Sequence, residues 1–152
     1  MASPFYDIER KAELAVQSVL SSVDLDGVPV YIATDTADET EDGQPGIRVP
    51  YIMIACTEAT PEMPGMVDGV YVCPVNVEVW SHRHDEPGAT HSGRLAKVRD
   101  ALIEDGLADA LSESIGDFHC FYCRGATLSA ENDASHAKGI VSLELVCAAS
   151  DL

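Results

Sequence analysis

Tyr71-Val-Cys-Pro-Val-Asn-Val-Glu-Val-Trp-Ser81 is the stretch of sequence that decides the fold. Over residues 69–80, apolar side chains recur at every second position, which is the period of a β-strand with one buried face. Asn76 and Glu78 fall on the opposite face. Pro74 has no amide hydrogen to donate to a neighbouring strand, so it predicts an edge strand or a bulge. The predicted buried face consists of Tyr71, Cys73, Val75, Val77 and Val79.

Toward the N-terminus, the sequence predicts two more strands and one helix. Residues 48–57 are rich in β-forming residues, with Pro50 near the start, where a strand tolerates proline. Residues 30–33 predict a short strand. Ahead of it, Ser3 suits a helix cap, Pro4 suits the first helical position, and Gly27-Val-Pro29 ends the helix. Between these limits, apolar residues recur at helical spacing: Phe5, Ile8, Ala12, Ala15, Val16, Val19 and Val23.

Toward the C-terminus, a loop at residues 81–88 precedes a second helix over residues 91–104, with Leu95, Val98 and Leu102 as its apolar stripe. Gly106 ends this helix, and residues 107–112 add a short turn. Residues 117–124 and 139–148 predict two further strands, separated by a polar excursion at residues 125–138. The order of elements predicts a single α+β domain over residues 1–152, with a mostly antiparallel β-sheet and two helices packed on one face.

The chain is strongly acidic, with 9 Lys and Arg against 26 Asp and Glu and a net charge of −17 over 152 residues. Nucleic acid and anionic lipid repel such a chain, which excludes binding driven by the DNA or RNA backbone. No signal peptide opens the sequence, and its apolar runs are far shorter than a membrane span, so we expect synthesis in the cytoplasm and no membrane partner. The cysteines lie in apolar segments and predict free, buried thiols: Cys56, Cys73, Cys120, Cys123 and Cys147.

Two groups of residues have the composition of a metal site. Cys120-Phe-Tyr-Cys123 has zinc or redox spacing, but its flanks indicate a strand, where positions three apart point to opposite faces. His82 and His84 share a face if the strand continues, with His91 as a third ligand, but they lie where a strand enters a Pro-Gly loop. The sequence therefore favours two buried thiols and a solvated loop, and we predict no metal site.

Residues 34–46 form a polar loop that contains five acidic residues, without the spacing or the glycine of an EF-hand. No nucleophile elbow and no phosphate-cradling glycine loop is present, and Ser92 beside His91 on a helix diverges from it. We therefore predict no enzyme activity, no catalytic residue and no cofactor.

Four blocks of sequence carry a resemblance to a known family. They are the opening helix Asp7-Ile-Glu-Arg-Lys-Ala-Glu-Leu, the proline-led strand Val49-Pro-Tyr-Ile-Met-Ile-Ala-Cys56, the block from Tyr71 to Ser81 with the following Thr90-His-Ser-Gly-Arg-Leu, and the last strand Gly139-Ile-Val-Ser-Leu-Glu-Leu-Val-Cys147. In pattern and order, over essentially the whole chain, the sequence resembles the tail terminator (tail-completion) proteins of long-tailed bacteriophages.

This resemblance implies a virion protein assembled in the bacterial host cytoplasm. Such a protein caps the tail tube as a hexameric ring, ends its polymerisation and forms the surface that joins the head connector or neck protein. Six copies carry 6 × −17, or −102, so DNA passes through the channel without specific binding. The polar loops are the candidate contacts between rings: Asp35, Asp38, Glu39, Glu41, Asp42, His82, His84 and Asp85.

Other functions remain open from sequence. The nearest is another neck or tail component, such as a head–tail joining or tube protein. A small metal-dependent enzyme, a metal-binding module and a binding domain with an acidic ligand surface are the further alternatives. Stoichiometric zinc in the purified protein would favour the metal-binding functions.

Overall fold

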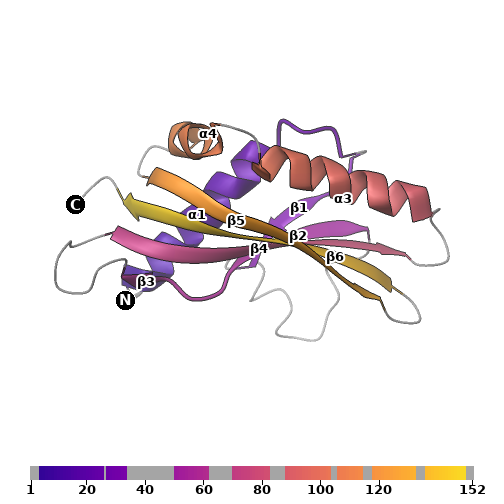
Figure 1. The fold of residues 1–152 in the computed structure, drawn as a ribbon, viewed down its shortest axis with the longest axis horizontal. Helices are drawn as coiled ribbons and strands as arrows, with labels where there is room; N and C mark the ends of the chain where they lie inside the picture. The colour runs from indigo at the N-terminus through magenta and orange to yellow at the C-terminus, as the bar shows by residue number, and fades with distance from the viewer. Residues whose placement is uncertain are drawn as a thin grey trace.

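The computed structural model describes residues 4–25, 27–33, 50–61, 70–82, 88–103, 106–114, 118–132 and 136–149. In these residues, a six-stranded sheet lies against three helices (Figure 1). This confirms the predicted α+β fold with a mostly antiparallel sheet, and a third helix forms where a short turn was expected. The elements are α1 (Pro4–Leu20), β1 (Val30–Ile32), β2 (Tyr51–Cys56), β3 (Thr60–Pro61), β4 (Val70–His82), α3 (Gly88–Ile103), α4 (Leu107–Ser114), β5 (Phe118–Asn132) and β6 (His136–Ala149).

The strand order in the sheet is β1-β2-β4-β6-β5, with β3 pairing β4 beside β2. Only β1 and β2 run parallel among these pairs. The register aligns Ile54, Val77 and Val141 in one row across β2, β4 and β6. Because side chains alternate along each strand, this row and its neighbours form one buried face. That face contains Ile52, Ile54, Cys56, Cys73, Val75, Val77, Val79, Val141, Leu143, Leu145 and Cys147.

Pro74 does not mark an edge strand, so that part of the prediction is wrong. It lies in β4, between β2 and β6 in the sheet, but the alternative of a bulge fits the register: residues 57–59 lie opposite only Cys73 and Pro74, a shift of one residue. The amide of Thr57 donates to the carbonyl of Pro74 at 3.0 Å, but Pro74 has no amide hydrogen to return the bond. The β2 ladder therefore ends at Cys56 opposite Val75, and β3 resumes the pairing at Thr60 opposite Val72, three residues earlier in β4.

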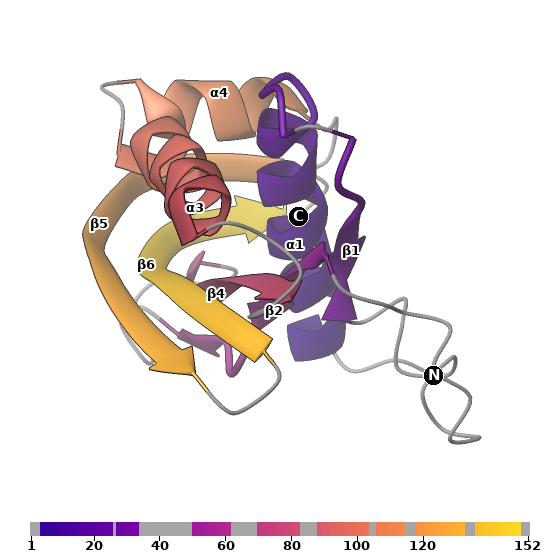
Figure 2. The same cartoon turned by 90° about the vertical axis from the view of Figure 1, so that its right-hand side faces the viewer.

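The helices cover the buried face, and the sheet curves around them so that β1 and β5 lie on opposite sides (Figure 2). From α1, five apolar side chains enter the core: Ile8, Ala12, Ala15, Val16 and Leu20. On α3, Val98 and Leu102 are buried, and Leu95 lies over Gly139 of β6. A Cβ at position 139 would lie 2.5 Å from a Leu95 methyl carbon, so glycine permits this close approach. Gly106, with φ of 88°, separates α3 from α4.

The predicted polar excursion at residues 125–138 is also wrong. β5 continues to Asn132, and β6 begins at His136. Their backbones pair as far as Asn132 opposite Ala137, beyond the point where the residues stop being apolar. Since a strand at the edge of a sheet is stabilised by its ladder as well as by side-chain burial, polar residues such as Thr127 and Ser129 are compatible with it.

Two carboxylates of α1 hold the end of β2. Glu13 is 1% exposed, and its Oε2 accepts a hydrogen bond from the amide of Cys56 at 2.8 Å. One turn earlier, Glu9 Oε1 accepts from the amide of Ala59 at 3.0 Å. These bonds supply acceptors to amides just before and after the interruption at Thr57. The helix thereby fixes the segment where the ladder passes from β2 to β3.

Replacement of Glu13 by Ala should lower the free energy of unfolding by about 1–3 kcal/mol, because it leaves the buried Cys56 amide without this acceptor. Glu13→Gln retains an acceptor oxygen and should cost less. Urea unfolding followed by circular dichroism measures both variants. The control is Glu113→Ala on the exposed side of α4. Equal losses for Glu13→Ala and Glu113→Ala would contradict a special role for the buried carboxylate.

Candidate interaction surface

The outer edge of β5 is the first candidate surface, and α4 covers its beginning. Ser112 Oγ accepts a hydrogen bond from the amide of Cys120 at 2.8 Å and lies 3.1 Å from the carbonyl oxygen of the same residue. It also lies 2.9 Å from the carbonyl oxygen of Ala108 in its own helix. One serine hydroxyl thus satisfies backbone groups that an edge strand otherwise presents to solvent or to another chain. In the described part of the chain, no strand pairs with β5 on this side.

Beyond this cover, β5 exposes two adjacent aromatic side chains. Phe121 is 49% exposed and Tyr122 is 44% exposed. The ring of His119 packs against Phe121 edge to face, with ring centroids 4.6 Å apart. Two register shifts, between Cys120 and Tyr122 and between Arg124 and Thr127, bend the strand at this point. The result is an aromatic patch on an edge strand, a surface of the kind that enters protein contacts.

This patch is not among the surfaces predicted from the sequence, although two adjacent aromatic residues in a predicted strand indicate it. Adjacent residues of a strand point to opposite faces, so Phe121 and Tyr122 cannot both enter the core of a sheet covered on one face. The sequence therefore requires at least one aromatic ring outside the core. Which ring that is depends on the bulge, and residue types alone do not reveal a bulge.

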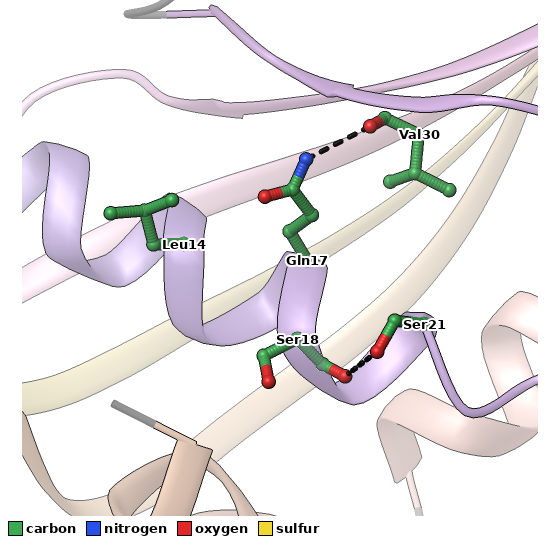
Figure 3. Close-up of a pocket in the computed structure, with 5 residues that line it drawn as sticks. All are labelled: Leu14, Gln17, Ser18, Ser21 and Val30. Carbon is green, nitrogen blue, oxygen red and sulfur yellow. Dashed lines mark hydrogen bonds between the residues drawn. The ribbon is translucent and has the colours of Figure 1, made fainter. Parts of the chain in front are cut away.

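A hollow at the opposite edge is the second candidate surface (Figure 3). It has a volume of about 520 Å³ and lies on α1 where this helix passes β1. Gln17 fixes the two elements by donating a hydrogen bond from its amide nitrogen to the carbonyl of Val30 at 2.9 Å. Ser21 Oγ donates to the carbonyl of Ser18 at 2.6 Å, which leaves its polar group engaged within the helix. The described lining is uncharged: Leu14, Gln17, Ser18, Ser21 and Val30.

The helix-free face of the sheet carries a row of aromatic and charged side chains that bind one another. Tyr51 stacks on Trp80 with centroids 5.7 Å apart, and Tyr31 meets Tyr51 edge to face at 6.3 Å. Lys138 Nζ lies 4.8 Å from the centre of the Trp80 ring and 3.5 Å from Glu78 Oε2, while the indole nitrogen donates to Glu78 Oε1 at 3.0 Å. Burial and the nearby Glu78 carboxylate raise the pKa of Tyr51. These side chains pair with one another across neighbouring strands, so their role is to stabilise the sheet.

The prediction that Cys120 and Cys123 lie in a strand is confirmed, but the prediction that their side chains point to opposite faces is wrong. Their side chains do not point to opposite faces: the two sulfurs lie 3.6 Å apart. The shift between Cys120 and Tyr122 places Cys120 opposite Cys147 and Cys123 opposite Leu145, both on the helix-covered face. The described cysteines are all free thiols, as predicted, but Cys123 is only half-buried. A second close pair, Cys73 and Cys147, has sulfurs 3.5 Å apart in the core.

Most of the predicted interface residues lie outside the described residues: Asp35, Asp38, Glu39, Glu41, Asp42, His84 and Asp85. His82 is the last residue of β4 and pairs with His136 of β6 through the backbone. His91, the third candidate metal ligand, falls in α3. A search of the described residues finds no group of three or more His, Cys, Asp or Glu that would hold a metal ion. The predicted contacts between rings therefore stay predictions.

The comparisons with known proteins do not assign the chain to a family. No protein-family model matches it, and no curated protein matches it. Among the described helices, none is both long enough and apolar enough to cross a bilayer.

Replacement of Ser112 by Ala should lower the free energy of unfolding by about 1–3 kcal/mol, because it removes the partner of the part-buried Cys120 amide. Hydrogen exchange at that amide should accelerate more than exchange at the centre of β6. Ser114→Ala is the matched control, since Ser114 Oγ donates its hydrogen bond to the carbonyl of Leu111 within the same helix. Indistinguishable effects of the two variants would show that Ser112 does not hold the edge of β5.

Proposed function

We propose that this chain is a virion assembly protein of the tail terminator type from a long-tailed bacteriophage. It forms a hexameric ring that caps the tail tube, ends tube polymerisation and presents a joining surface to the head connector. The sequence resemblance described above supports this proposal, and so do the small α+β fold and the net charge of −17. The observation that carries the proposal is a pair of different surfaces at opposite edges of one sheet: the aromatic patch and the hollow, whose described lining is uncharged.

A ring needs two different surfaces on each copy, because every protomer contacts its two neighbours head to tail. The aromatic patch on β5 supplies one, with Phe121 and Tyr122 projecting from the edge strand. The hollow beside β1 supplies the other, with Leu14 and Val30 as its apolar side chains. Since β1 and β5 are the two ends of the strand order, a contact between them adds copies in one direction, as ring closure requires.

Electrostatics favours the same two surfaces. Copies with a charge of −17 repel one another wherever their acidic surfaces meet. The aromatic patch and the described lining of the hollow contain no carboxylate, so contact between them adds no like-charge pair. The remaining acidic surface then faces the outside or the channel, where repulsion keeps DNA from adhering.

The cap function follows from the geometry of a closed ring. One face of the ring matches the last ring of the tube, and the opposite face does not repeat that match, so no further tube subunit adds. The opposite face is then available to the neck. No catalytic group enters this mechanism, and the protein acts through shape and charge.

Native mass spectrometry over a concentration series, with and without magnesium, tests the proposal. We expect a discrete hexamer and nothing larger. Phe121→Ser and Tyr122→Ser should each weaken the contact by about 2 kcal/mol, or roughly 30-fold, and shift the chain to smaller species. Ile103→Ser is the matched control, because Ile103 is 53% exposed on α3 and belongs neither to the aromatic patch nor to the described lining of the hollow.

Each other outcome has a definite meaning for the proposal. Open-ended polymers would identify a tube protein instead of a terminator. A monomer at every concentration would contradict self-closure into a ring. A hexamer that survives both aromatic substitutions would remove the β5 edge from the contact while leaving the ring intact. Equal disruption by Ile103→Ser would show that the aromatic variants act through stability.

A further inference from the structure

Cys120 and Cys123 form a facing pair of thiols that the proposed assembly function does not use. Their sulfurs are 3.6 Å apart, close to van der Waals contact and far closer than a regular strand would place them. The bulge between Cys120 and Tyr122 brings them together, so the pairing results from the backbone of β5. Sulfurs on the same side of the chain and at short range are one condition for a disulfide, and this strand meets that condition.

The two thiols are unlike each other, which suits them to different roles. Cys120 is 3% exposed, whereas Cys123 is half-buried and within reach of a small molecule. A hydrogen bond from the Cys120 thiol lowers the pKa of Cys123, against an opposing effect of burial. The same hydrogen bond, together with burial, raises the pKa of Cys120. Cys123 is therefore the group that reaches the reactive thiolate form, and Cys120 is the protonated partner beside it.

The other close pair provides an internal comparison. Cys73 and Cys147 have sulfurs 3.5 Å apart, but both side chains have no exposed surface. The pKa of Cys73 is raised, first by its hydrogen bond with Cys147 and also by burial. The distance between the two sulfurs is thus nearly the same in both pairs. The pairs differ because Cys123 is partly exposed to solvent and more readily forms a thiolate.

We propose that Cys120 and Cys123 are a thiol–disulfide exchange site whose substrate is a small, uncharged or cationic disulfide. The Cys123 thiolate attacks one sulfur of the disulfide RSSR, forms a mixed disulfide and releases RS⁻, which takes up a proton. Cys120 Sγ then attacks Cys123 Sγ and expels the second RS⁻, which takes up the proton that the Cys120 thiol loses. The chain loses two thiol hydrogens and is oxidised, while RSSR is reduced to two RSH.

The preference for an uncharged or cationic substrate follows from the surrounding charge. The chain has a net charge of −17, and Asp109 and Glu113 are exposed on α4, the helix that packs against β5. An anionic disulfide is repelled at this surface, and a cationic one is concentrated there. Added salt should narrow the difference between them, because it screens exposed charges.

Intact-mass spectrometry of the full chain, treated first with cystamine and then with a thiol-alkylating reagent, tests the proposal. We expect rapid loss of two alkylatable thiols and a mass lower by two hydrogens, reversed by dithiothreitol. Peptide mapping should place the bond between Cys120 and Cys123. Hydroxyethyl disulfide should react more slowly than cystamine, and oxidised glutathione, which is anionic, most slowly.

Three variants separate the roles of the cysteines. Cys120→Ala should stop the reaction at one cysteamine adduct on Cys123 and move the midpoint of its pH–rate profile upward, because the hydrogen bond that lowers the pKa of Cys123 is gone. Cys123→Ser should abolish the rapid reaction. Cys56→Ala, in β2 and separated from β5 by two strands, should leave it unchanged, and circular dichroism confirms that each variant is folded.

The proposal is overturned if all the thiols react only after urea is added, or if the bond forms between Cys73 and Cys147. It is equally overturned if Cys123→Ser still reacts rapidly, or if oxidised glutathione reacts as fast as cystamine at low salt. Because Phe121 and Tyr122 of the proposed ring contact lie between the two cysteines, the rates are measured on the monomer, below the concentration at which rings form, so the result is independent of the assembly function.

Discussion

The pairing of β4 with β6 is the constraint on which the rest of the structure depends. All 13 residues of β4 have a partner on β6, from Val70 opposite Ala148 to His82 opposite His136. A slip of one residue would turn every buried side chain of one strand to the other face. This register therefore determines which residues meet the helices, and it places Gly139 where Leu95 of α3 approaches. The position of α3 on the sheet follows from it.

The same strand organises the other half of the sheet through one missing hydrogen bond. Because Pro74 cannot donate to Thr57, the β2 ladder stops, and the chain passes to β3 through a short unpaired segment. At the two ends of this segment, the amides of the buried residues Cys56 and Ala59 need acceptors. Glu13 and Glu9 provide them from α1. The buried carboxylate of Glu13 therefore holds the end of the β2 ladder, next to the place where Pro74 interrupts it.

Much of the fold could be predicted because local pattern and tertiary burial agree. The alternation over residues 69–80 and the helical spacing from Pro4 correspond to β4 and α1. The predictions that failed depend on partners distant in sequence. Pro74 is tolerated in a central strand because a neighbouring strand ends there, and residues 125–132 are strand because β6 pairs with them. No local property of these residues carries that information.

The candidate sites show the same limit more strongly. Acidic loop residues attract attention in a sequence, whereas Phe121 looks like an ordinary strand residue until its edge position is known. Cys120 and Cys123 have redox spacing, but only the bulge decides whether their sulfurs meet. A single inserted residue therefore determines both the exposure of the aromatic pair and the contact between the thiols, since Phe121 and Tyr122 lie between the two cysteines. Either site changes if the bulge is removed.

The net negative charge of the chain limits which surfaces can meet when copies assemble. Several of the few cations are engaged within the fold: Lys138 with Glu78, Arg94 with Ser81, Lys97 with the carbonyl of Asp24, and Arg99 with Asp100. These contacts stabilise one copy and leave fewer cations to attract a neighbour. Repulsion between copies is screened over about 8–10 Å at physiological salt, so it acts mainly where surfaces nearly touch. Association must therefore use surfaces without carboxylates, and it should strengthen with salt until the charges are screened, unlike an interface held by ion pairs.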